Sequence, residues 1–221
     1  MDKKEIRPRL LVFASGTKDG GGSGFETLIE AQECGMLDAD IVGAVSQHSC
    51  GGVRKIAEKH SIPFFYFSPL HELLLSRYIL RETKADWIAF SGWLKKTKWL
   101  NPKTTFNIHP ARIAFGGRGM YGIHVHRAVI DAYQKGLIKD TAVSMHFVTD
   151  EYDKGPVFFE YPVPVYPTDT PEILQERVKG FEHLFQWVIT DMVIHEKISW
   201  DGKDPESLIV PEGYRFLPKK Q

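Results

Sequence analysis

Short apolar runs and longer amphipathic segments alternate along the first 92 residues of the chain. The apolar runs, each as long as a buried strand, are LLVFAS (10–15), IVGAVS (41–46), FFYFS (64–68) and WIAFSG (87–92). The segments between them, which have helical spacing, lie at 25–35, 51–60 and 69–84. This alternation predicts a parallel sheet with helices on both faces. We expect a Rossmann-like half over about residues 9–105, with ligands at the carboxyl ends of its strands.

The second half, about residues 106–200, has a different pattern. Strands are expected at 106–110, 142–148 and 157–165, and helices at 124–136 and 170–198. Two prolines in 157–165 place that strand at a sheet edge, and Thr170 followed by Pro171 is typical of a helix start. We therefore predict an α/β fold in which a mostly parallel central sheet flanked by helices continues into a mixed sheet. Residues 1–221 are expected to form one domain with a loop-rich tail at 201–221.

The composition is that of an ordinary globular protein. The chain has 28 basic and 28 acidic residues, so no overall positive field attracts nucleic acid. No apolar run is long enough to span a membrane, and no apolar signal region precedes Leu10. Cys34 and Cys50 fit neither a disulfide framework nor a zinc site, which favours a cytoplasmic location.

A glycine-rich stretch, SGTKDGGGSGFETL (15–28), links the first expected strand to the first expected helix. Backbone N–H groups in such a turn, together with the helix N-terminus, form an anion site. The stretch lacks the GK[ST] ending of a P-loop, and no acidic residue ends the second strand, so a dinucleotide is disfavoured. A bound phosphate group is the favoured interpretation, and a flexible turn is the alternative.

Asn107 and His109 alternate at the end of a short strand, so their side chains share one face of the sheet. An amide beside an imidazole can polarise a carbonyl group. An acidic partner is expected from Asp150, Glu151 or Asp153, although a simple polar turn would explain these residues equally well. The sequence has no GxSxG motif and no cysteine in an activating context, so a covalent intermediate is disfavoured.

His124 and His126 lie two residues apart at the start of an expected helix. This spacing points the two rings to different faces, whereas zinc-binding histidines on a helix are usually four residues apart. With no convincing third ligand nearby, a metal is not expected and structural roles are favoured. Of the two, His124 is the better candidate for a supporting role near the catalytic pair.

Four segments, in order, resemble the phosphoribosylglycinamide formyltransferases of the folate-dependent formyltransferase family. They are NIHP (107–110), GMYGIHVHRAV (119–129), SMHFVTDEYDKGPVFFEYPVPV (144–165) and DTPEILQERVKGFEHLF (169–185). The resemblance extends over essentially the whole chain. It implies the formyltransferase fold and an enzyme of purine biosynthesis that moves a formyl group from 10-formyltetrahydrofolate to the amine of glycinamide ribonucleotide.

The resemblance also implies which residues do the work. The catalytic residues correspond to Asn107, His109 and Asp153. Asn107 and a protonated His109 would stabilise the oxyanion, while Asp153 would keep the imidazole charged or relay protons. The substrate phosphate is expected at Gly22, Ser23 and Gly24, and other substrate contacts at Lys179 and Glu182. The folate-binding residues are expected to be Leu94, Lys95, Lys96, Thr97, Val148, Thr149, Asp150 and Asp153.

Other activities stay open at this point. They are a folate-dependent N-formyltransferase acting on an amino-sugar nucleotide or on methionyl-tRNA, a formyltetrahydrofolate hydrolase, and a catalytically silent relative that binds folate or nucleotide. The neutral net charge disfavours tRNA, and the presence of all three catalytic residues disfavours a silent relative. The expected partners are small molecules, with no nucleic acid, membrane or metal, and a homodimer is compatible with the resemblance.

Overall fold

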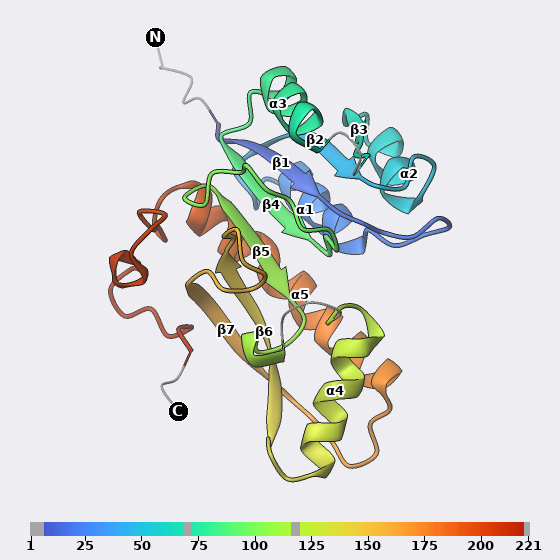
Figure 1. Ribbon diagram of the computed structural model, residues 1–221, viewed down its shortest axis with the longest axis vertical. Helices are drawn as coiled ribbons and strands as arrows, with labels where there is room; N and C mark the ends of the chain where they lie inside the picture. The colour runs from blue at the N-terminus through green and yellow to red at the C-terminus, as the bar shows by residue number, and fades with distance from the viewer. Residues whose placement is uncertain (1–6, 69–71, 116–119, 219–221) are drawn as a thin grey trace.

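Seven strands form one sheet in the part of the chain that the computed structural model describes, residues 7–68, 72–115 and 120–218. They are β1 (Arg9–Phe13), β2 (Asp40–Ser46), β3 (Phe64–Tyr66), β4 (Trp87–Ser91), β5 (Thr105–His109), β6 (Asp140–Phe147) and β7 (Val157–Pro164). Their order across the sheet is β3-β2-β1-β4-β5-β6-β7 (Figure 1). The strands from β3 to β5 are parallel, β6 runs antiparallel to β5, and β7 runs antiparallel to β6. The expected α/β fold with a mixed second half is confirmed.

The helices lie close to their expected positions. They are α1 (Ser23–Glu33), α2 (Gly52–Lys59), α3 (Glu72–Thr83), α4 (Ile123–Gln134) and α5 (Pro171–Ile194), with short 3₁₀ turns η2 (Ile113–Phe115) and η3 (Pro205–Ser207). The Thr170 hydroxyl caps α5 by accepting the Ile173 N–H at 3.3 Å, as the sequence predicts. The helix ends at Ile194 rather than at residue 198, because Glu196 adopts a left-handed φ of 56° that a helix cannot contain.

The parallel strands are buried on both faces. Along β1, Leu10 and Val12 belong to a core cluster that includes residues of α1 and α5. Leu11 and Phe13 alternate with them and belong to a second cluster that includes Ile79 of α3. Because both faces are covered, these strands have no polar side and appear in the sequence as continuous apolar runs.

The strand order reverses between β1 and β4, which are neighbours although they are not consecutive in the chain. In open α/β sheets, ligands bind at the carboxyl ends of the strands at such a point. The segments that follow the two strands are joined there: the Ser15 N–H donates to the Gly92 carbonyl at 3.2 Å, and the Leu94 N–H donates to the Ser15 hydroxyl at 2.8 Å. Parallel β5 ends at the same edge, which brings Asn107 and His109 to this region.

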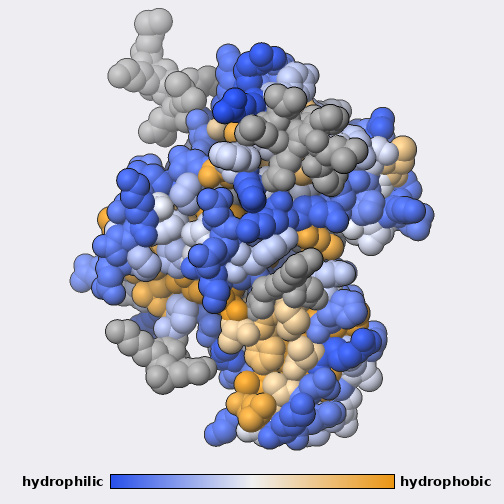
Figure 2. All heavy atoms as spheres, in the orientation of Figure 1, coloured by the Kyte–Doolittle hydropathy of each residue, from blue (hydrophilic) through white to orange (hydrophobic). Residues whose placement is uncertain are grey.

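β7 is the edge strand, as its prolines predict. The chain after α5 returns to it, since the Glu160 N–H donates to the Phe216 carbonyl at 2.6 Å and the rings of Phe216 and Phe159 lie 5.4 Å apart. Figure 2 shows a mostly hydrophilic face with hydrophobic residues gathered over its lower half, where the antiparallel strands and α4 lie. Within the described ranges, no helix combines the length and apolar character needed to cross a membrane.

Candidate active site

A cavity of about 690 Å³ opens at the carboxyl ends of β1, β4 and β5. Its walls are the glycine-rich loop after β1, the segment after β4, the end of β5, the start of α4, the loop after β6 and one side of α5. The residues in its lining that were expected to bind or act on the substrates are Gly22, Ser23, Gly24, Leu94, Asn107, His109, Asp153, Lys179 and Glu182. The structure therefore brings the expected phosphate-binding, catalytic and substrate-binding residues together around one space.

Hydrogen bonds and close packing hold the glycine-rich loop in shape. The Thr17 N–H donates to the Gly20 carbonyl at 2.7 Å, and the Gly20 N–H donates to the Thr17 hydroxyl at 2.9 Å. A Cβ on Gly52 of α2 would lie 2.4 Å from the Gly20 carbonyl oxygen, so α2 meets the loop without room for a side chain. Gly22 precedes α1 with a φ of 93° and no side-chain cap. The first N–H groups of α1 are thus available to an anion, and the flexible-turn alternative is disfavoured.

Polar side chains of α5 face this loop. Nε2 of His183 lies 3.1 Å from the Ser23 hydroxyl, and burial lowers the pKa of His183. The side-chain oxygen of the buried Gln186 lies 3.4 Å from the Ser91 hydroxyl. His183, Gln186 and Ser91 were not predicted from the sequence. Helical spacing could have found the first two, because residues four apart share a helix face: His183 follows Lys179 by four, and Gln186 follows Glu182 by four.

Glu182 is a titratable group within the cavity wall. Burial raises its pKa to about 7, while the positive charge of Lys179 acts in the opposite direction. Near neutral pH the carboxyl group is therefore close to half protonated, and a bound amine or ammonium group would favour its carboxylate form.

His146, which the sequence analysis did not single out, connects Asn107 to Asp153. Its Nε2 lies 3.1 Å from Asn107 Nδ2 and 3.4 Å from Asp153 Oδ1, and its Nδ1 lies 2.8 Å from the Phe147 carbonyl. Asn107 and His146 are direct partners in the β5–β6 ladder, a relation that only the register of the two strands reveals. A protonated Nε2 donates to Asp153, whereas an unprotonated one accepts from Asn107. The protonation of His146 therefore decides which partner it holds.

His109 is buried at the strand end. Burial lowers its pKa to about 4, although the negative charge of Asp153 acts in the opposite direction. The expectation that Asp153 keeps this imidazole charged does not hold in this structure, because the loss of hydration outweighs the attraction. The ring is neutral at neutral pH and makes a hydrogen bond to the backbone of Phe115 in η2.

The two histidines of α4 lie in the opposite positions to those expected. His126 is buried and lines the cavity, and burial lowers its pKa to about 4. His124 is exposed, and its ring stands edge-on to Tyr121 at 5.5 Å. The preference for His124 is wrong because α4 turns the face of Val125, His126 and Val129 inward. Among the described residues, no group of three or more His, Cys, Asp or Glu side chains could hold a metal ion.

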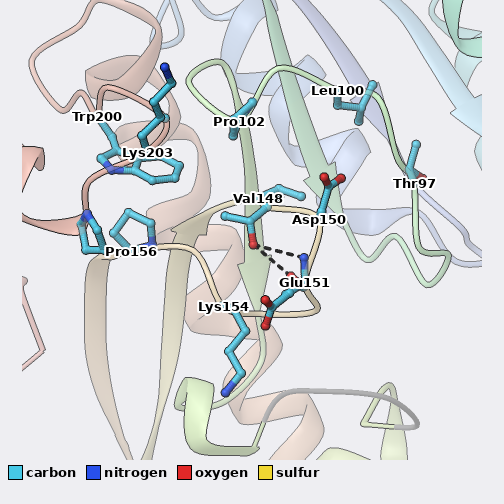
Figure 3. Close-up of a pocket in the computed structure, with 13 residues that line it drawn as sticks. Thr97, Leu100, Pro102, Val148, Asp150, Glu151, Lys154, Pro156, Trp200 and Lys203 are labelled. Atoms are coloured by element: carbon cyan, nitrogen blue, oxygen red, sulfur yellow. Dashed lines mark hydrogen bonds between the residues drawn. The ribbon is translucent and has the colours of Figure 1, made fainter.

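The residues expected to bind folate, apart from Leu94, border two hollows beside the main cavity. One of about 50 Å³ is lined by Lys95, Lys96, Thr97, Val148 and Thr149 together with Asn107, His146 and Asp153. The other, of about 530 Å³, is lined by Thr97, Val148, Thr149 and Asp150 on one side. Figure 3 shows Trp200 and Lys203 of the C-terminal segment across from Val148 and Asp150. This opposite wall was not predicted, since nothing in the pattern of residues 200–205 indicates what they face.

Comparison with known proteins agrees with this arrangement. The Formyl transferase family model matches residues 8–191. A chloroplastic phosphoribosylglycinamide formyltransferase from Arabidopsis thaliana is 34% identical over 207 residues, which cover 88% of this chain and 68% of that protein.

Two solved structures show the same fold at low sequence identity. Glycinamide ribonucleotide transformylase 1 from Symbiobacterium toebii superposes with a TM-score of 0.76 at 19% identity, over 93% of this chain and 95% of that one. A formyltetrahydrofolate deformylase from Pseudomonas syringae superposes with a TM-score of 0.73 at 19% identity, over 94% of this chain and 67% of that one. The fold alone is thus compatible with more than one reaction. The family match over most of the chain, together with the 34% identity to the Arabidopsis protein, shows that this chain belongs to the formyl transferase family.

Proposed function

We propose that this protein transfers a formyl group from 10-formyltetrahydrofolate to the amine of glycinamide ribonucleotide, a step of purine biosynthesis. The observation that carries the proposal is the cavity of about 690 Å³ that joins the start of α1 to Asn107, His109 and Asp153. An acceptor with a phosphate at one end and an amine at the other fits this arrangement. The name of the Arabidopsis relative supports the same acceptor.

At the strand end, the acceptor amine attacks the formyl carbon and negative charge develops on the formyl oxygen. When Nε2 of His146 carries a proton, it bonds to Asp153. The Asn107 amide can then turn to donate to the formyl oxygen. Nε2 of the neutral His109 ring is an acceptor, which suits it to take up a proton of the attacking amine through a bridging water. As the bond from carbon to the donor nitrogen breaks, the amine loses one proton and the donor nitrogen gains one. Asp153 and His146 are suited to relay that proton.

At the opposite end, the start of α1 and Lys179 suit a phosphate group. The N–H groups of Ser23 and Gly24 belong to the first helical turn, where the helix dipole favours negative charge. Lys179 lines the same cavity and adds a positive charge. Glu182 lines it as well, and its carboxyl group suits the acceptor amine.

The donor would occupy the hollows between residues 94–97 and 148–153. Their lining combines apolar walls from Leu100, Val148 and Trp200 with polar groups from Thr97 and Asp150. This mixture suits a flat ring system whose edges carry hydrogen-bonding groups. The smaller hollow also borders Asn107 and Asp153, so a donor bound there would reach the strand end.

We place the protein in the cytoplasm, with small molecules as its partners. Both cysteines are free and exposed, which suits a reducing compartment. A homodimer and independence from metal ions stay predictions, which light scattering and activity in the presence of EDTA would test.

The direct test is a formyl-transfer assay with 10-formyltetrahydrofolate and four conditions: glycinamide ribonucleotide, an amino-sugar nucleotide, methionyl-tRNA, and no acceptor. We expect turnover with glycinamide ribonucleotide, and EDTA should not reduce it. The Asp153→Asn variant measures the background. Turnover confined to the amino-sugar nucleotide would contradict the proposed acceptor, and release of formate that no amine accelerates would identify a hydrolase.

A further inference from the structure

Three buried polar atoms at the strand end have no hydrogen-bonding partner among the residues that the structure describes. They are Nε2 of His109, Nδ1 of His126 and Oγ of Ser144. Their residues are 5%, 2% and 0% exposed. Buried polar atoms in proteins are nearly always paired with a protein group or with ordered water. If the fold brings these three atoms together, one ordered water could therefore pair with all of them.

The topology does bring them together. His109 and Ser144 are direct partners in the antiparallel β5–β6 ladder, so their side chains leave the same face with Cβ atoms about 5 Å apart. The neighbouring pair on the same face of this ladder, Asn107 and His146, makes a side-chain contact of 3.1 Å. His126 comes from the first turn of α4 and lines the same cavity as His109. The two rings are close enough that the charge of His109 lowers the pKa of His126.

The hydrogen bonds of this group can be completed in a consistent way. The Phe115 carbonyl accepts a hydrogen bond from the His109 ring, so in the neutral ring the unpaired Nε2 is an acceptor. One water can donate to Nε2 and bond to the Ser144 hydroxyl and to the His126 ring, which gives it the three partners usual for a buried water. Besides His126 on α4, the titratable groups that face His109 are His146 on β6 and Asp153 in the loop after β6.

We propose that His126 is a positioning residue for formyl transfer, which acts with Ser144 through one buried water to hold Nε2 of His109 in a fixed orientation. The inference rests on the proposed function for its catalytic consequence, but the contact itself exists without substrates. A catalytic ring that is held before the reactants bind does not have to be ordered during the reaction.

The test uses the full chain and two kinds of measurement. His126→Phe keeps a flat ring and removes both nitrogens, His126→Gln keeps a polar group, and Ser144→Ala removes one partner with little change in volume. His124→Gln, on the same turn of α4 but exposed, is the matched control. NMR of the ring nitrogens reports the tautomer and bonding of His109 in each protein without substrates. Steady-state kinetics separates kcat from KM.

In His126→Phe we expect the His109 nitrogens to change from one tautomer to a mixture, and kcat to fall about tenfold with KM nearly unchanged. His126→Gln should recover most of the loss, Ser144→Ala should show a smaller change in the same direction, and His124→Gln should match the wild type. Unchanged His109 signals in both His126→Phe and Ser144→Ala would overturn the proposal, as would equal losses of kcat in the Phe and Gln variants. If the wild type transfers no formyl group, the proposed function fails, and the NMR result still decides this inference.

Discussion

The two ends of the cavity are shaped by different parts of the chain, the backbone at one end and side chains at the other. At the glycine loop the shape comes from the backbone, through positive φ angles at Gly16, Gly21 and Gly22 and the close approach of Gly52 to Gly20. At the strand end the shape comes from buried side chains, in which His146 lies between Asn107 and Asp153.

This difference separates two kinds of sensitivity. The backbone N–H groups of the loop do not titrate, so pH should change their shape little, but an added Cβ can displace them. A site made of buried imidazoles and a carboxylate keeps its shape when nearby surface residues change, but it responds to protonation. We therefore expect changes at the loop to affect acceptor binding and changes at the strand end to affect turnover.

The largest effect is expected from Asp153→Asn at the strand end. The substitution keeps the size of the side chain and removes the charge that faces His146. We expect kcat to fall about 100- to 1,000-fold because proton relay is lost, with the affinity for the donor nearly unchanged. Single-turnover kinetics and equilibrium titration of the donor measure the two quantities. Near-normal turnover would move the role to Asp150 or Glu151.

The pH dependence of folding is the next test of the strand end. The pKa values of His109 and His126 are lowered to about 4, so between about pH 6.5 and 4 the unfolded chain binds protons that the folded one does not. Stability should therefore fall as the pH falls through this range. Each histidine contributes up to about 3 kcal/mol to that loss.

The raised pKa of Glu182 has the opposite effect on stability between about pH 4.5 and 7, so the wild type alone does not reveal the contribution of one histidine. A variant that lacks His126 isolates that contribution. Denaturant unfolding of the wild type and of His126→Gln at several pH values supplies the comparison. The free energy of unfolding of the variant should rise relative to that of the wild type as the pH falls. A difference between the two proteins that does not change with pH would show that folding does not lower the pKa of His126.

At the glycine loop, Gly52→Ala should weaken acceptor binding. The new Cβ would lie 2.4 Å from the Gly20 carbonyl, so the loop must shift. Forced overpacking of this kind costs about 1–3 kcal/mol, which corresponds to a rise of about five- to 150-fold in the acceptor KM if the cost falls on the bound loop. Gly20→Ala is the matched control, since a Cβ at Gly20 meets nothing within 4 Å. Equal effects of the two substitutions would show that the packing of α2 does not shape the site.

The smallest effect concerns Glu182, a titratable residue at the acceptor side. Its pKa of about 7 means that the carboxylate is lost between about pH 8 and 6. If the carboxylate holds the acceptor amine, the acceptor KM should rise several-fold as the pH falls through this range, with a smaller change in kcat. Glu182→Gln should abolish this pH dependence. A wild-type KM that is flat from pH 8 to 6 would assign the amine to another group.

Much of the fold could be predicted because both faces of the parallel strands are buried, which leaves apolar runs that are easy to recognise. That Asn107 and His109 share one face of the sheet could also be predicted, because it depends only on the period of a single strand. His146 could not be identified in this way, because its role depends on the register between β5 and β6. The difference between His124 and His126 depends on which face α4 turns inward, and the low pKa of His109 depends on burial by distant segments.

The measurement that tests the central claim most directly compares glycinamide ribonucleotide with its dephosphorylated form as formyl acceptors, in the wild type and in Gly52→Ala. If the start of α1 binds the phosphate while the strand end does the chemistry, removing the phosphate should lower kcat/KM of the wild type about a hundredfold, mainly through KM. Gly52→Ala should lose most of that preference and keep its turnover of the dephosphorylated acceptor. Equal kcat/KM values for the two acceptors in the wild type would contradict the account.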